Sequence, residues 1–557
     1  MTQYPHMVPV VIIGAGPTGL TLANLLAAYG VDFIIVDREP GPLDLPRAIV
    51  LDDEGARTMQ VFGLDDSYLQ STVAAAGSRY FTDKGECFAE TGPGPLTYGF
   101  AKRQYIYQPE LEAALRERLE QQRPGTLFYS SEVVDIACGD GEAAVTVKAP
   151  GGSLHTISAS WVAACDGGRS PMRERLGIAM SGNTYKQDWI VLDMTDDPDH
   201  SLLSKFFCSN VRPAVSVPAP NGGRRYEFML LPGETREEVL ETGFLTDLLK
   251  PFRSYDEAHV LRKTVYTFHA RIADRFRDKR ILLMGDAAHL TPPFAGQGMN
   301  AGLRDAHNVA WKLAASLLGG ASPSILDTYD SERRKPAWDM ILLAVSMGNF
   351  VMPLGEEDIR FRDHLLKALG PFPAVKDYLM TMRFKPKPRH EAGLYLDLGA
   401  QMLEASLVGE MIPQPTVHRD GRSVRLDRLL GTGFALLAQS DAGAGALQQL
   451  DRTELLGLPL SKVILSSGFL NASAGAWQTG AWQAGPEAAA IARPLLTHRD
   501  QVMLIRPDRY CAAVFPPAEL QAGLDRYLSL TAAADEDSSP TMACAQLSSS
   551  SRQVSTA

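Results

Sequence analysis

The chain has 557 residues, of which 45% are hydrophobic and 21% charged, the composition of an ordinary soluble globular protein with several domain-sized units. No stretch of about 18 uninterrupted apolar residues is present, which excludes a membrane-spanning helix on sequence grounds. The 54 basic and 65 acidic residues leave a net charge of −11 with mixed signs, so a small organic ligand is expected rather than nucleic acid.

Cysteine usage indicates reduced thiols. The six cysteines are scattered, with no C-x-x-C pair and no histidine placed to complete a zinc set, so no metal is expected. The first nine residues lack the basic region of a signal peptide. We therefore expect a cytoplasmic protein that does not associate with membranes.

The first predicted element is a buried strand over residues 10–13, which runs into a glycine-rich turn. A helix over residues 20–29 ends at Gly30, a residue suited to the left-handed conformation of a helix C-cap. A second strand over residues 32–36 completes a βαβ unit. This unit predicts an α/β fold with a Rossmann-like nucleotide-binding domain.

The middle of the chain mixes helices and strands. Leucines spaced by four predict a helix over residues 108–121. Strand patterns follow at 127–134, 143–148 and 161–165, and short β-rich runs between about 185 and 271 predict an inserted antiparallel sheet. A strand at 280–284, a helix at 302–318 and a mostly helical stretch at 335–382 complete this part.

The last third of the chain is predicted to form a separate unit. Two prolines at 384–388 indicate a linker, a further unit covers about 393–530, and the serine-rich residues 533–557 are expected to be a disordered tail.

The glycine-rich turn matches the dinucleotide-binding pattern G-x-G-x-x-G. Gly14 suits the tight turn, Gly16 lets the backbone approach a pyrophosphate, and Gly19 allows close helix packing. Asp37 stands 23 residues after Gly14, where an acidic side chain would bind ribose hydroxyls. The pattern alone leaves the nucleotide undecided.

Two later segments, C-D-G-G-R-S at 165–170 and G-D-A-A-H at 285–289 with P-F-A-G-Q-G-M-N at 293–300, resemble the further motifs of group A flavoprotein monooxygenases. The resemblance implies that FAD is bound, with Asp286 accepting ribityl hydroxyls and the amides after Pro293 facing the flavin. The residues expected to bind the cofactor are Gly14, Gly16, Pro17, Thr18, Gly19, Asp37, Arg38, Arg47, Gln108, Asp166, Gly167, Gly285, Asp286, Pro293, Gly296, Gly298, Met299 and Asn300.

Within that family, the chain resembles the branch that hydroxylates 3-(3-hydroxyphenyl)propionate and 3-hydroxycinnamate. P-R-A at 46–48, E-F-M at 227–229 and R-P-D-R at 506–509 carry this resemblance, which spans residues 10 to about 530. It implies an FAD-binding domain interwoven with an antiparallel-sheet substrate domain, followed by a thioredoxin-like C-terminal domain without thiol redox activity. The implied boundaries are 1–184 and 276–388 for FAD binding, 185–275 for substrate, 393–530 for the thioredoxin-like domain and 533–557 for the tail.

The resemblance also implies the reaction. NADH or NADPH reduces FAD, O2 adds to the reduced flavin, and a C4a-hydroperoxide inserts one oxygen ortho to the phenol to give the 2,3-dihydroxyphenyl product of aromatic catabolism. With a single dinucleotide fingerprint, the nicotinamide cofactor is expected to bind transiently. The expected partners are a small aromatic acid and O2, and a homodimer is one candidate assembly.

Three residues are candidates for activating the phenol. Asp52 comes first, although a solvated loop acid or a helix N-cap is an equal alternative. Tyr266 and His269 follow, because a strand of the inserted sheet would present them to the flavin, while His289 is expected to orient its loop. For the substrate carboxylate, Arg212, Arg224 and Arg225 are candidates without an assignment.

Other functions share the flavin motifs. A monooxygenase that tailors a polyketide or antibiotic, or one that hydroxylates another simple phenol, would differ in the size of its substrate pocket. A flavin halogenase is disfavoured because no W-x-W-x-I-P segment occurs. A non-catalytic flavin-binding protein is the alternative outside enzymes.

Overall fold

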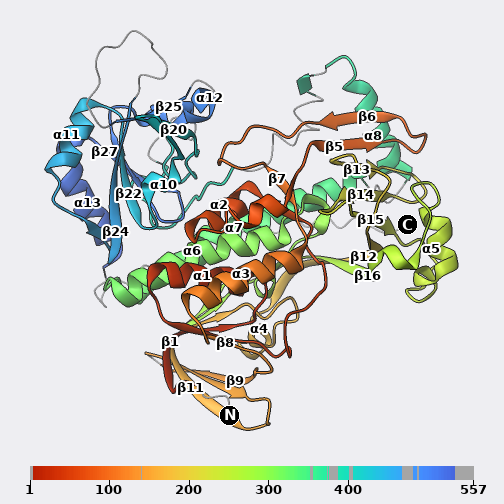
Figure 1. Ribbon diagram of the computed structural model, residues 1–557, viewed down its shortest axis with the longest axis horizontal. Helices are drawn as coiled ribbons and strands as arrows, with labels where there is room; N and C mark the ends of the chain where they lie inside the picture. The colour runs from red at the N-terminus through yellow and green to blue at the C-terminus, as the bar shows by residue number, and fades with distance from the viewer. Residues whose placement is uncertain are drawn as a thin grey trace.

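The computed structural model describes residues 4–139, 141–351, 356–372, 374–375, 387–399, 406–466, 481–485 and 488–532. In these residues three large sheets and several long helices are arranged as shown in Figure 1. The predicted tail at 533–557 and most of the predicted linker at 384–388 lie outside the described residues. Among the described helices, none combines the length and apolar composition that a membrane span requires.

The first sheet confirms the predicted βαβ start. Strand β1 (Met7–Ile13) lies parallel to β2 (Phe33–Val36) on one side and to β11 (Leu154–Ala164) on the other. Helix α1 (Pro17–Tyr29) begins three residues earlier than predicted, because proline is well tolerated in the first helical turn. The helix ends at Gly30 with a φ of 79°.

The predicted strand at 127–134 is two strands. β8 (Leu127–Phe128) extends the first sheet beside β2, whereas β9 (Glu132–Cys138) pairs with β10 (Ala143–Lys148). Ser130 separates them with a φ of 50°, a left-handed backbone conformation that a strand does not accommodate. The prediction was therefore wrong about the continuity of this strand.

The second sheet is the predicted antiparallel sheet, extended by a hairpin from earlier in the chain. Strands β5 (Gly77–Phe81) and β6 (Cys87–Thr91) form its edge. β5 pairs in parallel with β13, a strand that lies more than 120 positions later in the chain. The remaining strands are β12 (Met180–Met194), β13 (Leu203–Phe207), β14 (Ala214–Pro218), β15 (Arg224–Met229), β16 (Val260–Ala273) and β19 (His289–Leu290).

The two faces of this second sheet bury different partners. One face carries residues such as Ile190, Tyr226 and Phe228, which pack with helix α5 (Thr242–Leu249). Because side chains alternate along a strand, Val191 and its cross-strand neighbour Glu227 face the other way. That other face looks toward the nucleotide-binding unit.

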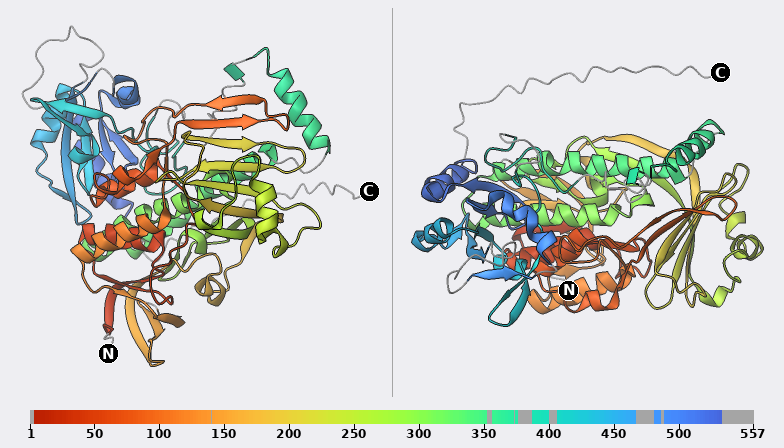
Figure 2. Two further views of the ribbon diagram at one scale, coloured as in Figure 1. Left: turned by 45° about the vertical axis from the view of Figure 1, so that its right-hand side comes forward. Right: turned by 90° about the horizontal axis from the view of Figure 1, so that it is seen from above.

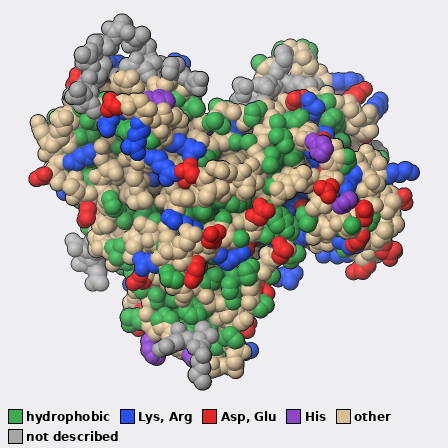
Figure 3. Space-filling view, viewed as in Figure 1, with side chains coloured by type: hydrophobic (Ala, Val, Ile, Leu, Met, Phe, Trp, Pro, Cys, Tyr) green, Lys and Arg blue, Asp and Glu red, His purple; other side chains and the backbone are tan. Residues whose placement is uncertain are grey.

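Long helices pack beside the first two sheets. They are α3 (Gln108–Gln122), α6 (Gly298–Leu318), α7 (Asp327–Val351) and α8 (Glu356–Ala368). In Figures 1 and 2 the second sheet and the C-terminal elements from β20 (Thr416–Arg419) to α13 (Leu520–Ser529) lie toward opposite ends of α6 and α7. On the face seen in Figure 3, acidic and basic side chains are both scattered among other residues.

The C-terminal unit contains the third sheet, whose core is a parallel pair followed by an antiparallel pair. β22 (Phe434–Ala438) and β24 (Leu458–Ser466) are parallel and are connected through α11 (Asp441–Gln449). β26 (Val502–Ile505) and β27 (Cys511–Phe515) are antiparallel and precede α13 (Leu520–Ser529). The outer strands are β20 (Thr416–Arg419), β21 (Arg422–Arg425) and β25 (Trp482–Ala484).

Buried ion pairs attach the C-terminal unit to the rest of the molecule. Arg57 pairs with Asp427 at 2.7 Å, and Arg506 pairs with Glu332 at 2.7 Å. All four side chains are almost inaccessible to solvent. Since an unpaired charge at such a depth is strongly unfavourable, the unit is held in place rather than loosely tethered.

Candidate active site

A cavity of about 630 Å³ runs between the first sheet and the inward face of the second. Its lining includes the turn after β1, residues 47–50, the turn at 290–299 and strands β12 to β16. This volume falls in the range of small-molecule and cofactor sites, roughly 300–1,000 Å³. A single space therefore connects the nucleotide-binding turn with the antiparallel sheet.

The glycines of the first turn have the geometry of a phosphate cradle. Gly14 has a φ of 104°, and a Cβ there would lie 2.4 Å from the carbonyl oxygen of Cys165. A Cβ at Gly16 would meet no atom within 4 Å, so its backbone is open on that side. The amide end of α1 has no side-chain cap and no acidic residue in its first turn, which suits it to bind an anion.

Asp37 and Gln108 shape the neighbouring wall of the cavity. The Asp37 carboxylate accepts hydrogen bonds from the amides of Ala15 at 2.6 Å and Glu39 at 2.8 Å. The Gln108 side-chain oxygen accepts from the Ala48 amide at 2.6 Å. Asp37 is therefore fixed beside the glycine-rich turn, and Gln108 fixes the backbone at Ala48.

The turn around Asp286 is held in place by contacts with the Asp305 carboxylate. One Asp305 oxygen accepts from the Gly285 amide at 3.1 Å and lies 2.7 Å from Nε2 of His289. The other accepts from Arg333 at 2.9 Å. His289 is completely buried, as expected of a residue that orients this turn. Asp286 lines the cavity, and burial raises the pKa of its carboxyl.

These residues fit an FAD molecule. The cradle that a Cβ at Gly16 would enter, the uncapped α1 amides and the carboxylates of Asp37 and Asp286 offer donors and acceptors for a pyrophosphate and sugar hydroxyls. The residues predicted to bind the cofactor that line the cavity are Gly14, Gly16, Pro17, Thr18, Asp37, Arg38, Arg47, Gln108, Asp166, Gly167, Asp286, Pro293, Gly296, Gly298 and Met299.

Three predicted cofactor residues are not in the cavity lining. A Cβ at Gly19 would lie 2.1 Å from the Gly14 carbonyl oxygen, and one at Gly285 would lie 2.5 Å from Oγ1 of Thr18. Both glycines are thus required by packing. Asn300 is fully buried and donates to the carbonyls of Val50 at 3.1 Å and Gly296 at 2.8 Å. These three residues pack against the turns that line the cavity but do not face the cavity themselves.

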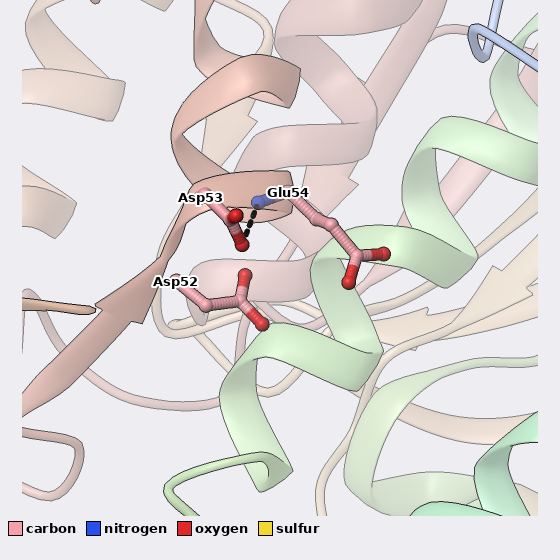
Figure 4. A group of neighbouring side chains, drawn as sticks. All are labelled: Asp52, Asp53 and Glu54. Carbon is pink, nitrogen blue, oxygen red and sulfur yellow. Dashed lines mark hydrogen bonds between the residues drawn. The ribbon is translucent and has the colours of Figure 1, made fainter. Parts of the chain in front are cut away.

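Asp52 is a helix cap and not a cavity residue. One of its oxygens accepts from the Gly55 amide at 2.9 Å at the start of α2 (Asp53–Val61), and the other pairs with Arg304. Figure 4 shows Asp52, Asp53 and Glu54, whose ligand oxygens lie within 4.8 Å of one another. Arg304 also pairs with Glu54 at 2.7 Å and so offsets the charge of the group. The placement of Asp52 at 2% exposure corrects the expectation that it reaches the phenol.

Tyr266 and His269 do line the cavity. The Tyr266 hydroxyl accepts a hydrogen bond from Arg262, whose guanidinium lies 4.8 Å from the tyrosine ring centre. Nδ1 of His269 lies 3.0 Å from Oγ1 of Thr184. Burial lowers the pKa of His269, and nearby arginines lower it further, so the imidazole is neutral at pH 7.

The three arginines considered for the substrate carboxylate are already occupied. Arg212 pairs with Glu234, and Arg224 is buried among carbonyl and hydroxyl acceptors. Arg225 lines the cavity, but it donates to Asp193 at 2.6 Å and to two backbone carbonyls at 2.7 and 2.9 Å. None of the three has a free donor fork for a ligand.

Two charged residues of the cavity lining were not predicted as site residues from the sequence. Arg103, on β7 (Arg103–Tyr105), lines the cavity, and no acidic side chain in the described part of the chain pairs with it. Glu227, on β15, also lines the cavity and is 8% exposed. The signal for Glu227 was present, because Arg225 and Glu227 are charged residues two positions apart and therefore lie on the same face of a mostly buried strand.

Comparison with known proteins gives consistent matches. A family model described as an FAD binding domain matches residues 7–344, and one described as an HcaD C-terminal domain matches residues 409–530. A Klebsiella pneumoniae protein named 3-(3-hydroxy-phenyl)propionate/3-hydroxycinnamic acid hydroxylase is 37% identical over 526 residues, covering 93% of this chain and 94% of that protein. The protein of that name from Escherichia coli (strain K12) is 36% identical over 529 residues, covering 94% and 95%.

Solved structures share the fold. The flavin-dependent monooxygenase PieE, solved with FAD and substrate, has a TM-score of 0.74 at 20% identity, covering 94% of this chain and 99% of that one. Aklavinone-11 hydroxylase, solved with FAD and aklavinone, has a TM-score of 0.74 at 22% identity, covering 95% and 100%.

Proposed function

Because the chain belongs to the FAD-binding-domain family of flavin-dependent hydroxylases, we propose that it hydroxylates 3-(3-hydroxyphenyl)propionate and 3-hydroxycinnamate ortho to the phenol, giving 2,3-dihydroxyphenyl products. The names of relatives that match almost the whole chain support this substrate class. One structural observation carries the proposal. The dinucleotide cradle opens into a space walled by apolar side chains. Two arginines of its lining, Arg47 on the cofactor side and Arg103, form no ion pair with an acidic residue in the described part of the chain.

FAD is held by the chain's own groups in this proposal. The α1 amides face the pyrophosphate, Asp37 and Asp286 accept from sugar and ribityl hydroxyls, and Gln108 fixes the adjoining segment. When bound, FAD accepts a hydride from NADH or NADPH and activates O2 for transfer of one oxygen atom to the aromatic ring.

The inward face of the second sheet binds the aromatic acid. The Arg103 guanidinium, which lines the cavity, offers a planar donor fork to the carboxylate, and the ring packs against the apolar walls. Exclusion of water by these walls protects the reactive oxygen species from side reactions. Tyr266 and His269 border the ring position, and Asp52 acts indirectly by capping α2. The apolar walls are Val191, Phe206, Val215, Val217, Phe268 and Phe294.

The proposal extends to the rest of the chain. The C-terminal unit is a thioredoxin-like domain, which its β22–α11–β24 crossover and its β26–β27 hairpin followed by α13 support. The proposed substrate domain comprises residues 185–275 together with the hairpin β5–β6, which pairs with the same sheet. The proposed location is the cytoplasm, and the proposed assembly is a homodimer.

The experiment is a coupled assay with purified protein. Bound FAD is measured by absorbance, NADH or NADPH oxidation is followed with and without 3-(3-hydroxyphenyl)propionate, and the catechol is identified by chromatography. We expect stimulated oxidation and stoichiometric catechol. A flavin-containing protein that forms no catechol from any phenolic acid would refute the substrate while leaving cofactor binding intact.

A further inference from the structure

Glu227 occupies a central position on the cavity-facing side of the second sheet. Its neighbours in register are Val191 on β12 and Val215 on β14, both apolar and both in the cavity lining. The carboxylate is thus set in an apolar surface that faces the space proposed for the aromatic ring. A charged group in such a position is unfavourable unless a donor satisfies it.

No donor from the described residues satisfies the Glu227 carboxylate with a hydrogen bond. Its nearest cation is Arg225, at 4.0 Å, which is beyond hydrogen-bond distance. Arg225 in turn directs its donors to Asp193 and to the carbonyls of Pro46 and Arg47. The carboxylate oxygens therefore remain available to a ligand that brings its own O–H group.

The other carboxylates of the cavity lie on the cofactor side. They are Asp37, Glu39, Glu132, Asp166 and Asp286, which belong to the first sheet and its turns. Asp37 and Asp166 accept hydrogen bonds from backbone amides. Among the described acidic residues that line the cavity, Glu227 is the one on the antiparallel sheet.

We propose that Glu227 is the catalytic residue that accepts the proton of the substrate's phenol hydroxyl; the inference rests on the function proposed above. The phenolic O–H bond breaks, its electron pair stays on the ring oxygen, and a new O–H bond forms on the Glu227 carboxylate. The ring oxygen then feeds electron density to its ortho carbon, the atom to be hydroxylated. When the product regains its aromatic ring, the carbon-bound proton is lost to solvent and Glu227 returns its proton to the phenolic oxygen.

The charges around Glu227 suit this exchange. Burial raises the pKa of its carboxyl, Arg225 opposes the rise, and Asp193 adds to it. Tyr266 and Arg262 are the other titratable groups on this part of the face, and they are hydrogen-bonded to each other. A carboxylate with a raised pKa is a better match to a phenol, whose pKa is near 10, than an ordinary glutamate.

The test compares Glu227→Gln with the matched control Glu90→Gln in the FAD-loaded enzyme. Glu90 lies on β6 of the same sheet, is exposed and pairs with Arg79 at the surface. We expect E227Q to lower kcat for catechol formation on the order of 10²- to 10⁴-fold, with FAD content unchanged. The loss should shrink for ring-fluorinated phenols of lower pKa and as the pH approaches 10, whereas E90Q should match the wild type.

Binding provides a readout besides activity. Titration with 3-(3-hydroxyphenyl)propionate and with 3-phenylpropionate should show that the wild type prefers the hydroxylated acid and that E227Q loses most of this preference. If E227Q does not fold, Glu227→Asp should fold and show a reduced kcat with the wild-type pH profile.

Two results would overturn the inference. The first is an E227Q enzyme that equals E90Q in kcat and binding, and the second is a loss that is the same for phenols of every pKa. If E227Q fails to fold, an E227D enzyme with unchanged kcat, or with an altered pH profile, would also overturn it. A wild type that converts no phenolic acid would instead refute the proposed function.

Discussion

Replacing Arg103 by glutamine tests how the substrate carboxylate is recognised. Arg103 lines the cavity and forms no ion pair with a described acidic residue, so its removal leaves no buried carboxylate unpaired. The substitution should therefore affect ligand binding rather than folding. This makes it a clean perturbation of one contact.

The expected size of the effect follows from that contact. A hydrogen bond to a charged group contributes about 1.5–3 kcal/mol, and about 1.4 kcal/mol corresponds to a factor of ten in affinity. Arg103→Gln should thus raise KM for 3-(3-hydroxyphenyl)propionate by roughly 10- to 150-fold. For 3-propylphenol, which has the same ring but no carboxylate, KM should change by less than a factor of about three.

The assay measures KM and catechol yield for both compounds in the wild type, R103Q and a surface control. Arg79→Gln is that control, because Arg79 lies on β5 of the second sheet, does not line the cavity and pairs with the exposed Glu90. Equal losses on the acid and on 3-propylphenol would show that Arg103 has a structural role and would refute the reasoning. An unchanged KM for the acid would do the same.

Three further predictions concern the cofactor cradle, α2 and pH. Gly16→Val should abolish FAD absorbance while circular dichroism stays native, because a side chain there enters open space without backbone strain; a yellow variant would contradict the cradle. Asp52→Asn should lower the free energy of unfolding by about 3 kcal/mol in chemical denaturation, since it breaks the buried pair with Arg304. The kcat of the folded fraction should stay unchanged. A large fall in kcat at unchanged stability would show that Asp52 takes part in the reaction. His307 has its pKa lowered to about 4 by burial, so the folded state binds fewer protons than the unfolded state below pH 6.5. Stability should fall by about 2 kcal/mol from this residue between pH 7 and pH 5, and His307→Gln should remove that part; an identical pH dependence in the variant would refute it.

Local patterns explain why the cradle could be predicted. The roles of Gly14, Gly16 and Gly19 depend on a turn between adjacent elements, and the structure has a positive φ at Gly14, open space beside Gly16 and close packing at Gly19. The helix C-cap at Gly30 is likewise a property of its own helix. Features of this kind need no information from distant residues.

Long-range contacts explain what could not be predicted. Whether an aspartate after a strand caps a helix or faces a substrate depends on partners such as Arg304, which is 252 positions from Asp52. Glu227 and Arg103 face the cavity only because their strands pair in a particular register within different sheets. The hairpin at 77–91 joins the second sheet through a parallel pairing that no local pattern indicates.

The C-terminal unit illustrates the same limit. Its separation from the preceding residues was predicted from composition, but the buried pairs Arg57–Asp427 and Glu332–Arg506 link residues more than 170 positions apart. Such pairs define how a domain docks, and a single sequence does not reveal them.

We propose that this flavin-dependent hydroxylase adds one atom of O2 to the ring of 3-(3-hydroxyphenyl)propionate. Mass spectrometry of the product formed under isotopically labelled dioxygen tests it most directly. We expect 2,3-dihydroxyphenylpropionate carrying one labelled oxygen, with one NADH or NADPH consumed for each product. Unlabelled product, or cofactor oxidation that yields only hydrogen peroxide, would contradict it.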